Sequence, residues 1–424
     1  MIYLGKTLAE KLLASHTSDG NAAAGDIVEA KVDLLMVHEV LGSRIIPILK
    51  EMEFIKVWDP QKIVVVNDHW APASDINSAE IHRRNRNFVR EQGITHFYDV
   101  DCGISHHVLP EKGLIAPGEL IIGSDSHSTT YGAFNAFSTG LAATDSALIL
   151  ATGSCWFRVP ESIRIEVNGE LPDMVMSKDL ILKIISKLGP DGANYQSIEF
   201  CGDTIEKMKV GERMTMCNMT VEAGAKCSPM LVNDHVRRWM ESLAPSKKWK
   251  ETLPDSDAEY VDAYSYDLKR DPLEPMVAIP DSPTNGKPVR EVSGVPIDQA
   301  FIGSCTNGRI QDLEIAAKIL KGKKIRQGVR LIITPASKQT YMMALDRGLV
   351  KIFMDAGGIV TNSTCGACVG GHLGVLGAGE VCISSTNRNF KGRMGHQNSR
   401  IYLASPATVA ASALKGAITD PRSV

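Results

Sequence analysis

Short, continuously apolar runs recur along the chain, and each is followed by a polar turn. The runs at residues 63–66 and 120–122 consist of Ile, Val and Leu, which is typical of strands buried on both faces of a parallel sheet. A charged helix is predicted between them, at residues 79–92. This alternation of buried strand, polar turn and helix indicates an α/β fold.

The same pattern extends over most of the 424 residues. A stretch rich in Pro, Ser, Asn and Gly, residues 271–296, is predicted to be a surface linker. A strand or strand pair is predicted at residues 27–36. Further strands are predicted at residues 163–167, 300–302, 329–334, 359–360 and 381–383, and helical segments at residues 6–15, 42–52 and 132–153.

A chain of this length exceeds one hydrophobic core, so several domains are expected. The change to an alternating apolar pattern after Pro160 indicates a first boundary, and the predicted linker a second. We therefore predict three α/β domains, over residues 1–158, 159–285 (with the linker) and 286–424.

Polar clusters stand where strands of the predicted sheets end. Ligands of open α/β sheets bind beyond the carboxyl ends of strands, so these clusters are expected to meet. An Asp beside a His holds the imidazole in one tautomer for general acid work, and arginine binds carboxylates through paired hydrogen bonds. Taken singly, each cluster is also explained as a solvated turn or surface arginine. The clusters are Asp68-His69; His106 and His107; Asp125-Ser126-His127; and Asn387-Arg388 with Arg393.

Three cysteines lie in two turns rich in small residues: Cys305, and the pair Cys365 and Cys368. A structural zinc site normally closes with four protein ligands, and an electron-transfer cluster is usually held by four cysteines. Three thiolates instead indicate a [4Fe–4S] cluster with one iron left open as a Lewis acid for substrate oxygens. The Cys-x-x-Cys spacing alone is weak, because zinc, redox chemistry and plain burial also explain it.

The other six cysteines are interpreted as buried small hydrophobes. An odd total of nine, spread over a long chain, argues against a disulfide framework and favours a reducing cytoplasm. The net charge of −3 gives no electrostatic reason to expect nucleic acid or an anionic membrane as partner. No run approaches the roughly eighteen apolar residues that span a bilayer. The six are Cys102, Cys155, Cys201, Cys217, Cys227 and Cys382.

Asn218 and Glu222 are four residues apart in a stretch that also contains several Met and Val residues. If the stretch is helical, the two side chains share one face. Such a pair usually belongs to an exposed stripe, but the apolar neighbours favour a functional role here.

Four motifs together resemble the large subunits of the aconitase superfamily hydro-lyases, especially the 3-isopropylmalate dehydratase and homoaconitase group. The resemblance extends from about residue 25 to Pro421. The motifs are Gly123-Ser-Asp-Ser-His127, Phe301-Ile-Gly-Ser-Cys-Thr-Asn-Gly308, Cys365-Gly-Ala-Cys-Val-Gly370 and Thr386-Asn-Arg-Asn-Phe-Lys-Gly-Arg393.

The resemblance implies an aconitase-like fold, with three α/β domains around a central iron–sulfur cluster and without the fourth, swivelling domain. It implies the reversible removal of water from a malate-type 2-hydroxy acid. By motif, Cys305, Cys365 and Cys368 correspond to cluster ligands; Asp68, His69, His106, Asp125 and His127 to the network that protonates the departing hydroxyl; Glu222 to the acid that orders the iron-bound water; and Ser126, Asn218, Asn387, Arg388 and Arg393 to substrate contacts.

One part of the family's machinery has no counterpart here. The base that removes the α-proton is a serine in a Tyr-Gly-x-Gly-Ser-Ser-Arg-Glu motif, and this motif is absent from the sequence. The resemblance therefore implies a small subunit that brings the swivel domain and the catalytic serine, and a large subunit that is inactive alone.

The sequence leaves the substrate open among related acids. 3-Isopropylmalate is the first expectation, but departures from the usual pattern at residues 38–44, 68–70 and 370–372 leave room for 2,3-dimethylmalate or homocitrate. In that first segment, Arg44 is either a substrate contact or an exposed helix residue. Two other classes stay open as well: a cluster-free RNA-binding protein and a zinc-stabilised structural subunit without chemistry.

Overall fold

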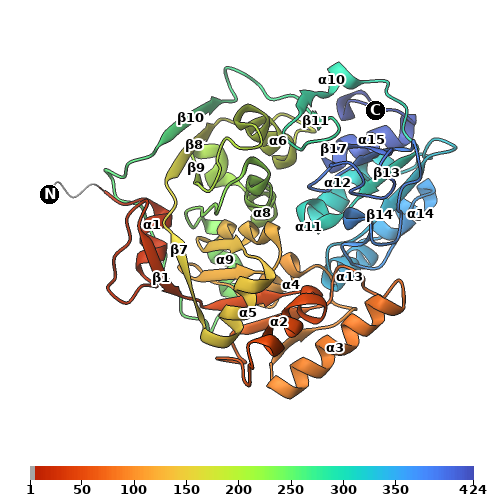
Figure 1. Ribbon diagram of the computed structural model, residues 1–424. Coiled ribbons are helices and arrows are strands. Elements are labelled where there is room, and N and C mark those ends of the chain that lie inside the picture. The colour runs from red at the N-terminus through yellow and green to blue at the C-terminus, as the bar shows by residue number, and fades with distance from the viewer. Residues whose placement is uncertain (1–4) are drawn as a thin grey trace.

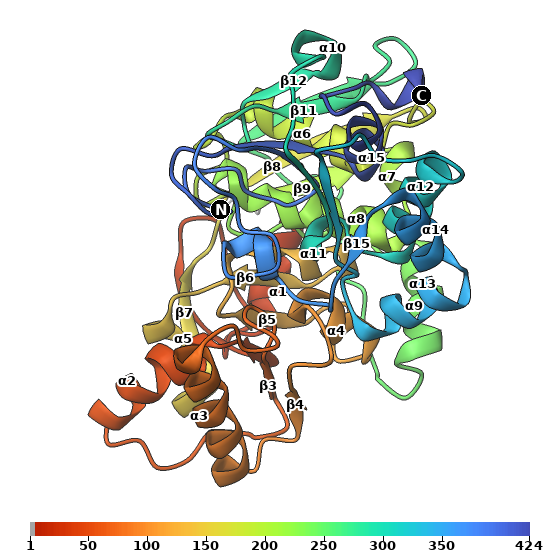
Figure 2. The same cartoon turned by 90° about the vertical axis from the view of Figure 1, so that its right-hand side faces the viewer.

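The described residues form four β-sheets: a two-stranded ribbon and three larger sheets, each with its own helices, which surround a central region where loops from all three meet (Figures 1 and 2). The computed structural model describes residues 5–424. One hydrophobic cluster contains Met36, Ile165 and Phe301, one from each sheet, so the sheets pack on a shared core. None of the described helices is long and apolar enough to cross a membrane.

The first sheet has five parallel strands in the order β4-β3-β2-β5-β6. The strands predicted from the apolar runs at residues 63–66 and 120–122 are confirmed as β3 and β5, and every residue of both is buried. Strands of this sheet are β2 (Leu34–Val37), β3 (Ile63–Val66), β4 (His96–Tyr98), β5 (Leu120–Gly123) and β6 (Phe137–Gly140). The helices around it are α1 (Leu8–Ala14), η1 (Leu41–Ile45), α2 (Ile46–Glu51), α3 (Ile76–Gln92), α4 (Ser105–Glu111), η2 (Ser126–Phe134) and α5 (Ala143–Thr152).

One prediction in this region is only partly right. The helical segment predicted at residues 132–153 is interrupted by β6, whose single large apolar residue, Phe137, gives a weak strand signal. The strand or strand pair predicted at residues 27–36 is a pair, and its members lie in different sheets, since β1 (Ile27–Lys31) forms an antiparallel ribbon with β7 (Ser154–Arg158) while β2 enters the five-stranded sheet.

The second sheet has three parallel strands in the order β10-β8-β9. Its strands are β8 (Ser162–Asn168), β9 (Ser197–Cys201) and β10 (Asp262–Asp267), and its helices are α6 (Ser177–Leu188), α7 (Asp203–Lys207), α8 (Val210–Met219), η3 (Thr220–Ala223) and α9 (Asp234–Leu243). The predicted strand at residues 163–167 is confirmed as β8.

The third sheet has seven strands in the order β12-β11-β17-β16-β13-β14-β15, and β11 is antiparallel to both of its neighbours, β12 and β17. The four strands predicted for this region are confirmed as β13, β14, β15 and β16. Strands are β11 (Met276–Ala278), β12 (Gly286–Pro288), β13 (Gln299–Ile302), β14 (Arg330–Ile333), β15 (Ile359–Val360), β16 (Val381–Ser384) and β17 (Arg400–Ala404). Helices are α10 (Val289–Val292), α11 (Ser304–Asn307), α12 (Ile310–Leu320), α13 (Lys338–Asp346), α14 (Leu349–Ala356), η4 (Gly366–Val369), α15 (Pro406–Lys415) and η5 (Pro421–Ser423).

The linker predicted at residues 271–296 therefore contains two short strands and helix α10, and β11 is buried beside β17. A three-residue apolar run is too short to be recognised as a strand from sequence. The domain boundaries drawn from composition stay a prediction.

Candidate active site

The centre of the molecule is built from turns that follow strands of the first and third sheets, together with the end of α8. Helix α11, which carries Cys305, packs against both α4 and α8. Ser304, the residue before Cys305, has φ of 80°, in the left-handed region that non-glycine residues rarely adopt. Backbone strain of this kind, at a residue beside a candidate ligand, is typical of functional sites.

The three candidate cluster cysteines are buried in this centre, and the Ser304 hydroxyl lies 3.7 Å from Cys305 Sγ and 3.6 Å from Cys368 Sγ. Two side-chain amides donate to Cys305 Sγ, Asn218 Nδ2 at 3.3 Å and Asn387 Nδ2 at 3.2 Å. N–H groups aimed at sulfur stabilise a thiolate, so this arrangement suits a sulfur atom that carries negative charge.

These cysteines fit an iron–sulfur group as ligands. Burial raises the pKa of Cys305 to about 12 and raises that of Cys365 well above its ordinary value, so both thiols stay protonated unless a cation replaces the proton. A positively charged metal centre supplies that replacement, and the two asparagine donors fit the resulting thiolate. Of the six other cysteines, Cys102 and Cys201 are half-exposed, whereas the remaining four are buried as interpreted from sequence.

A chain of carboxylate–imidazole pairs lies beside the cysteines. His69 Nδ1 donates to Asp68 Oδ1 at 2.6 Å, and His69 Nε2 lies 3.6 Å from Asp125 Oδ2. His106 Nε2 donates to Asp125 Oδ1 at 2.9 Å, while its Nδ1 lies 3.2 Å from the Tyr131 hydroxyl. The carboxylate of Asp125 thus joins two histidines that come from different turns.

The same chain continues into the second sheet's region. His127 Nε2 donates to Glu222 Oε1 at 2.7 Å, and Arg388 Nε donates to the same oxygen at 2.8 Å. The backbone N–H of His127 donates to Asp125 Oδ1 at 2.7 Å. The predicted acid and base residues and one predicted substrate arginine therefore form one connected network.

Burial and partners act in opposite directions on these groups. Burial opposes ionisation of His69, but the Asp68 and Asp125 carboxylates outweigh it and raise the His69 pKa well above its ordinary value. Burial likewise opposes ionisation of Asp125 and Glu222, but hydrogen bonds from the histidines, and Arg388 beside Glu222, lower both carboxyl pKa values. The result is a set of charged pairs with little exposure to water.

One residue connects the network to the cysteine turn. The backbone carbonyl of Asp68 accepts from Cys365 N and from the Thr364 hydroxyl, both at 2.8 Å, while its carboxylate accepts from Ser105 N at 2.7 Å. The turn that presents Cys365 is therefore fixed by the residue that orients His69.

The predicted substrate residues are not equally integrated. Asn218 lies in the last turn of α8, whereas Glu222 lies in the 3₁₀ helix η3. The two are therefore not on one α-helical face, although both side chains reach the centre. Ser126 makes a single long contact, 3.5 Å to His127 Nδ1. Arg393 has a buried Nε without a hydrogen-bond partner among the described residues. Arg44 is exposed, as its alternative interpretation expected.

Two buried residues near the centre were not identified from sequence. Glu39 Oε1 accepts from the backbone N–H of His69 at 2.8 Å and of Trp70 at 3.2 Å, and ligand atoms of His38, Glu39, Asp68 and His69 converge within 4.8 Å. Glu39 Oε1 and Asp68 Oδ1 accept from N–H donors, whereas Glu39 Oε2 has no hydrogen-bond partner among the described residues.

Lys178 is fully buried, and its Nζ donates to the carbonyls of Ser385, at 3.2 Å, and Thr386, at 2.6 Å. Those carbonyls directly precede Asn387 and Arg388. Burial lowers the pKa of Lys178 to about 7. A lysine in the first turn of an amphipathic helix usually lies in solvent, so its sequence gives no signal of this role.

Comparisons with known proteins identify the family to which this chain belongs. The model of the aconitase family (aconitate hydratase) matches residues 10–416, and this chain belongs to the aconitase family. It is 49% identical to the 3-isopropylmalate dehydratase large subunit 1 of Methanopyrus kandleri, over 99% of both chains.

Two further relatives are similar over nearly their whole length. The chain is 47% identical to the 3-isopropylmalate dehydratase large subunit of Heliobacterium modesticaldum, over 99% of this chain and 100% of that one. It is 46% identical to the probable methanogen homoaconitase large subunit of Methanothermobacter thermautotrophicus, over 98% and 97%. The crystal structure of aconitase X from Thermococcus kodakaraensis has a TM-score of 0.48 at 12% identity, over 85% of this chain and 84% of that one.

Proposed function

We propose that this chain is the large subunit of a two-subunit hydro-lyase that reversibly dehydrates a malate-type 2-hydroxy acid, with 3-isopropylmalate as substrate. The observation that carries the proposal is the convergence of three buried cysteines with one connected network from Asp68 to Arg388. Full-length relatives named as 3-isopropylmalate dehydratase large subunits support the substrate.

The residues that would hold a [4Fe–4S] cluster are Cys305, Cys365 and Cys368. When bound, such a group with one iron free of cysteine supplies a Lewis acid that makes hydroxide a better leaving group. Asn218 and Asn387 donate to the Cys305 sulfur and hold it in place.

Protons are handled by the imidazole–carboxylate pairs. His106 is held by Asp125 and His69 by Asp68, so each ring is held in a defined orientation for proton transfer to the departing hydroxyl. Glu222, ionised between His127 and Arg388, serves as the acid and base for water in the reverse direction.

Substrate carboxylates are bound by the turn after β16. Arg388 keeps N–H groups beyond the one given to Glu222, and Arg393 Nε has no hydrogen-bond partner within residues 5–424, so both guanidinium groups have donors for a carboxylate. Asn387 orients this turn through its contacts with Asn218 and Cys305. Ser126, beside His127, is a further proposed substrate contact.

The partner in this proposal is a small subunit that carries the swivel domain and the base for the α-proton. The relatives' name, large subunit, supports such a partner. We place the enzyme in the cytoplasm, because none of its nine cysteines is paired in a disulfide.

The alternative substrates are homocitrate and 2,3-dimethylmalate. The homoaconitase relative, at 46% identity, favours keeping homocitrate beside 3-isopropylmalate, because it is nearly as similar as the dehydratases.

The test is to purify the chain anaerobically with its small subunit and to follow formation of the unsaturated acid from each substrate by absorbance. Turnover of 3-isopropylmalate that requires both chains, and that Cys305→Ser abolishes together with bound iron, supports the proposal. Turnover of another acid in the set corrects the substrate and keeps the class. Zinc without sulfide in the purified protein would overturn the cluster assignment.

A further inference from the structure

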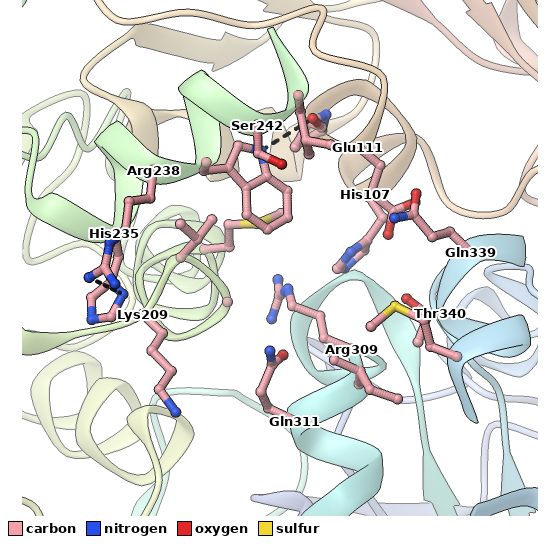
Figure 3. A pocket seen from close by; sticks show the side chains of 18 residues that line it. His107, Glu111, Lys209, His235, Arg238, Ser242, Arg309, Gln311, Gln339 and Thr340 are labelled. Carbon is pink, nitrogen blue, oxygen red and sulfur yellow. Dashed lines mark hydrogen bonds between the residues drawn. The ribbon is translucent and has the colours of Figure 1, made fainter. Parts of the chain in front are cut away.

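A cavity of about 460 Å³ lies behind the wall of the active site, between α4, α8, α9, α12 and α13 (Figure 3). Its lining contains none of the predicted catalytic, substrate or cysteine residues. In Figure 3 the side chains of His107 and Arg309 point toward one another at its inner wall. The cavity is therefore a separate space from the candidate active site.

Three helices begin at this cavity. The first turns of α8, α12 and α13 contribute Val210, Ile310 and Thr340 to its lining, and all three helices are at least nine residues long. The N-terminus of a helix carries a partial positive charge and unpaired N–H groups, which favours anions. Three such ends at one cavity create a positive potential inside it.

Charged side chains add to this potential. Lys209, Arg238 and Arg309 line the cavity together with His235, whereas Glu111 is the single carboxylate in the lining. The salt bridges of the described residues include neither Lys209 nor Arg238, and both are exposed at the mouth. Burial raises the pKa of Glu111 to about 7, so this carboxyl opposes an anion only weakly at neutral pH.

The inner wall contains a buried cation. Arg309 is 6% exposed, and its Nη2 donates to the Cys305 carbonyl at 2.8 Å, while Asp312 Oδ2 lies 3.9 Å from Nη1. Its Nε has no hydrogen-bond partner among residues 5–424. His107 Nε2 donates to the same carbonyl at 3.3 Å. Arg309 Nη1 donates to the Thr215 hydroxyl and the Thr306 carbonyl, so the guanidinium contributes a fixed, buried positive charge to the inner wall, which favours an anion in the cavity.

The rest of the lining is apolar. Trp239, Met214, Met343 and Pro110 form most of the surface between the cations. Such a lining favours a ligand with an apolar, preferably aromatic, body, because indole rings and methionine sulfur pack well on aromatic faces. Small inorganic anions would leave this surface wet.

We propose that this cavity binds a small organic acid, whose carboxylate is held by the cations and helix N-termini and whose apolar body packs on Trp239 and the methionines. The site is distinct from the hydroxy-acid site of the proposed function. Its inner wall, through Arg309 and His107, holds the carbonyl of Cys305.

The test is isothermal titration calorimetry of the assembled enzyme with 4-phenylbutanoate. Two controls are run in parallel: 4-phenylbutanamide, which has the apolar body but no charge, and acetate, which has the carboxylate but no aromatic body. We expect 4-phenylbutanoate to bind at least about tenfold more tightly than either, because each lacks one half of the recognition. Equal binding of the acid and the amide, or no binding of the acid, overturns the proposal.

Variants locate the binding. Lys209→Gln with Arg238→Gln should weaken 4-phenylbutanoate about five- to tenfold, as expected for two partly exposed charge contacts, and Ser242→Trp should block the mouth. The matched control, Lys207→Gln with Arg237→Gln, removes the same charge from neighbouring exposed positions outside the lining and should leave binding unchanged. Loss of binding in Arg388→Gln, with the cavity variants unaffected, would place the ligand in the active site and overturn the proposal.

Discussion

Glu222 Oε1 lies 2.7 Å from His127 Nε2, although the two residues are 95 positions apart in the chain. The same oxygen accepts from Arg388 Nε at 2.8 Å, so one buried carboxylate links residues that follow strands of two different sheets. The His127 imidazole and the Arg388 guanidinium both already donate to this oxygen, so Glu222 is held in place from two sides.

Glu222→Gln keeps the size of the side chain but removes its charge and its ability to exchange protons. We expect kcat for dehydration to fall by about 100-fold or more, in the range of lost general acid–base catalysis. Iron content should be unchanged, because Glu222 does not contact the cysteines. Glu206→Gln, at an exposed position of α7, is the matched control. Full activity of Glu222→Gln would remove this residue from the chemistry.

Serine substitutions test which cysteines hold the proposed cluster. Cys305→Ser, Cys365→Ser and Cys368→Ser should each lower the iron and sulfide bound per chain, because serine is a poor ligand for this type of cluster. Cys102→Ser, at a half-exposed position, should retain both. Metal analysis and visible absorbance after anaerobic reconstitution give the readout. Thermal unfolding of each variant checks that it is folded, and full retention of iron by any of the three would contradict its assignment.

Lys178→Met removes the donor that pairs two buried carbonyls before Asn387. Each carbonyl left unpaired costs about 1–3 kcal/mol, so we expect the free energy of unfolding to fall by a comparable amount. The KM should also rise, because Asn387 and Arg388 lose the anchor of their turn. Urea unfolding and steady-state kinetics measure the two effects. Lys187→Met, exposed on the same helix, should change neither, and equal behaviour of both variants would contradict the role of Lys178.

Glu39→Gln tests whether the carboxylate beside His69 tunes its protonation. The pKa of His69 is held well above its ordinary value against burial by Asp68 and Asp125, with a further contribution from Glu39. Removing that negative charge disfavours the imidazolium, so the limb of the kcat/KM profile that follows His69 should move to lower pH. Glu51→Gln is the exposed control. An unmoved limb, or a shift to higher pH, would contradict the coupling.

Ligand binding in the cavity should depend on pH through Glu111. This carboxyl accepts from the Ser337 hydroxyl, faces Lys112, Thr340 and Arg309, and ionises near pH 7 because burial raises its pKa. As pH rises through about 7 its charge repels the bound carboxylate, and affinity for 4-phenylbutanoate should fall by about tenfold. Glu111→Gln should flatten this dependence in calorimetry between about pH 6 and 8. An equally steep fall in the variant would contradict the role of Glu111.

The sequence predicted the parts of the fold whose signal is local. Strands β3 and β5 are runs of large apolar residues, and a buried parallel strand needs little more than such a run. Strand β6 was missed because Phe137 is its one large apolar residue, and β11 because three residues carry no period. Their burial comes from neighbours in the sheet, which a single sequence does not display.

The candidate site was recognised for the same kind of reason. Polar clusters at strand ends and cysteine turns are readable in short windows, and family motifs gave them roles. Glu39 and Lys178 were not found, because each acts on backbone atoms of a distant segment and neither stands in a recognisable pattern. Arg393 was selected by motif, yet its guanidinium makes no contact with the network.

The hydrogen bonds between Asp68 and the turn that contains Cys365 join segments that are synthesised at very different times. Thr364 is 296 positions from Asp68, and Arg388 is 166 positions from Glu222. During synthesis Cys305 leaves the ribosome well before Cys365, Cys368 and Arg388. In a nascent chain, the proposed cluster site, with its three cysteines and Arg388, is therefore incomplete until Arg388 has been translated.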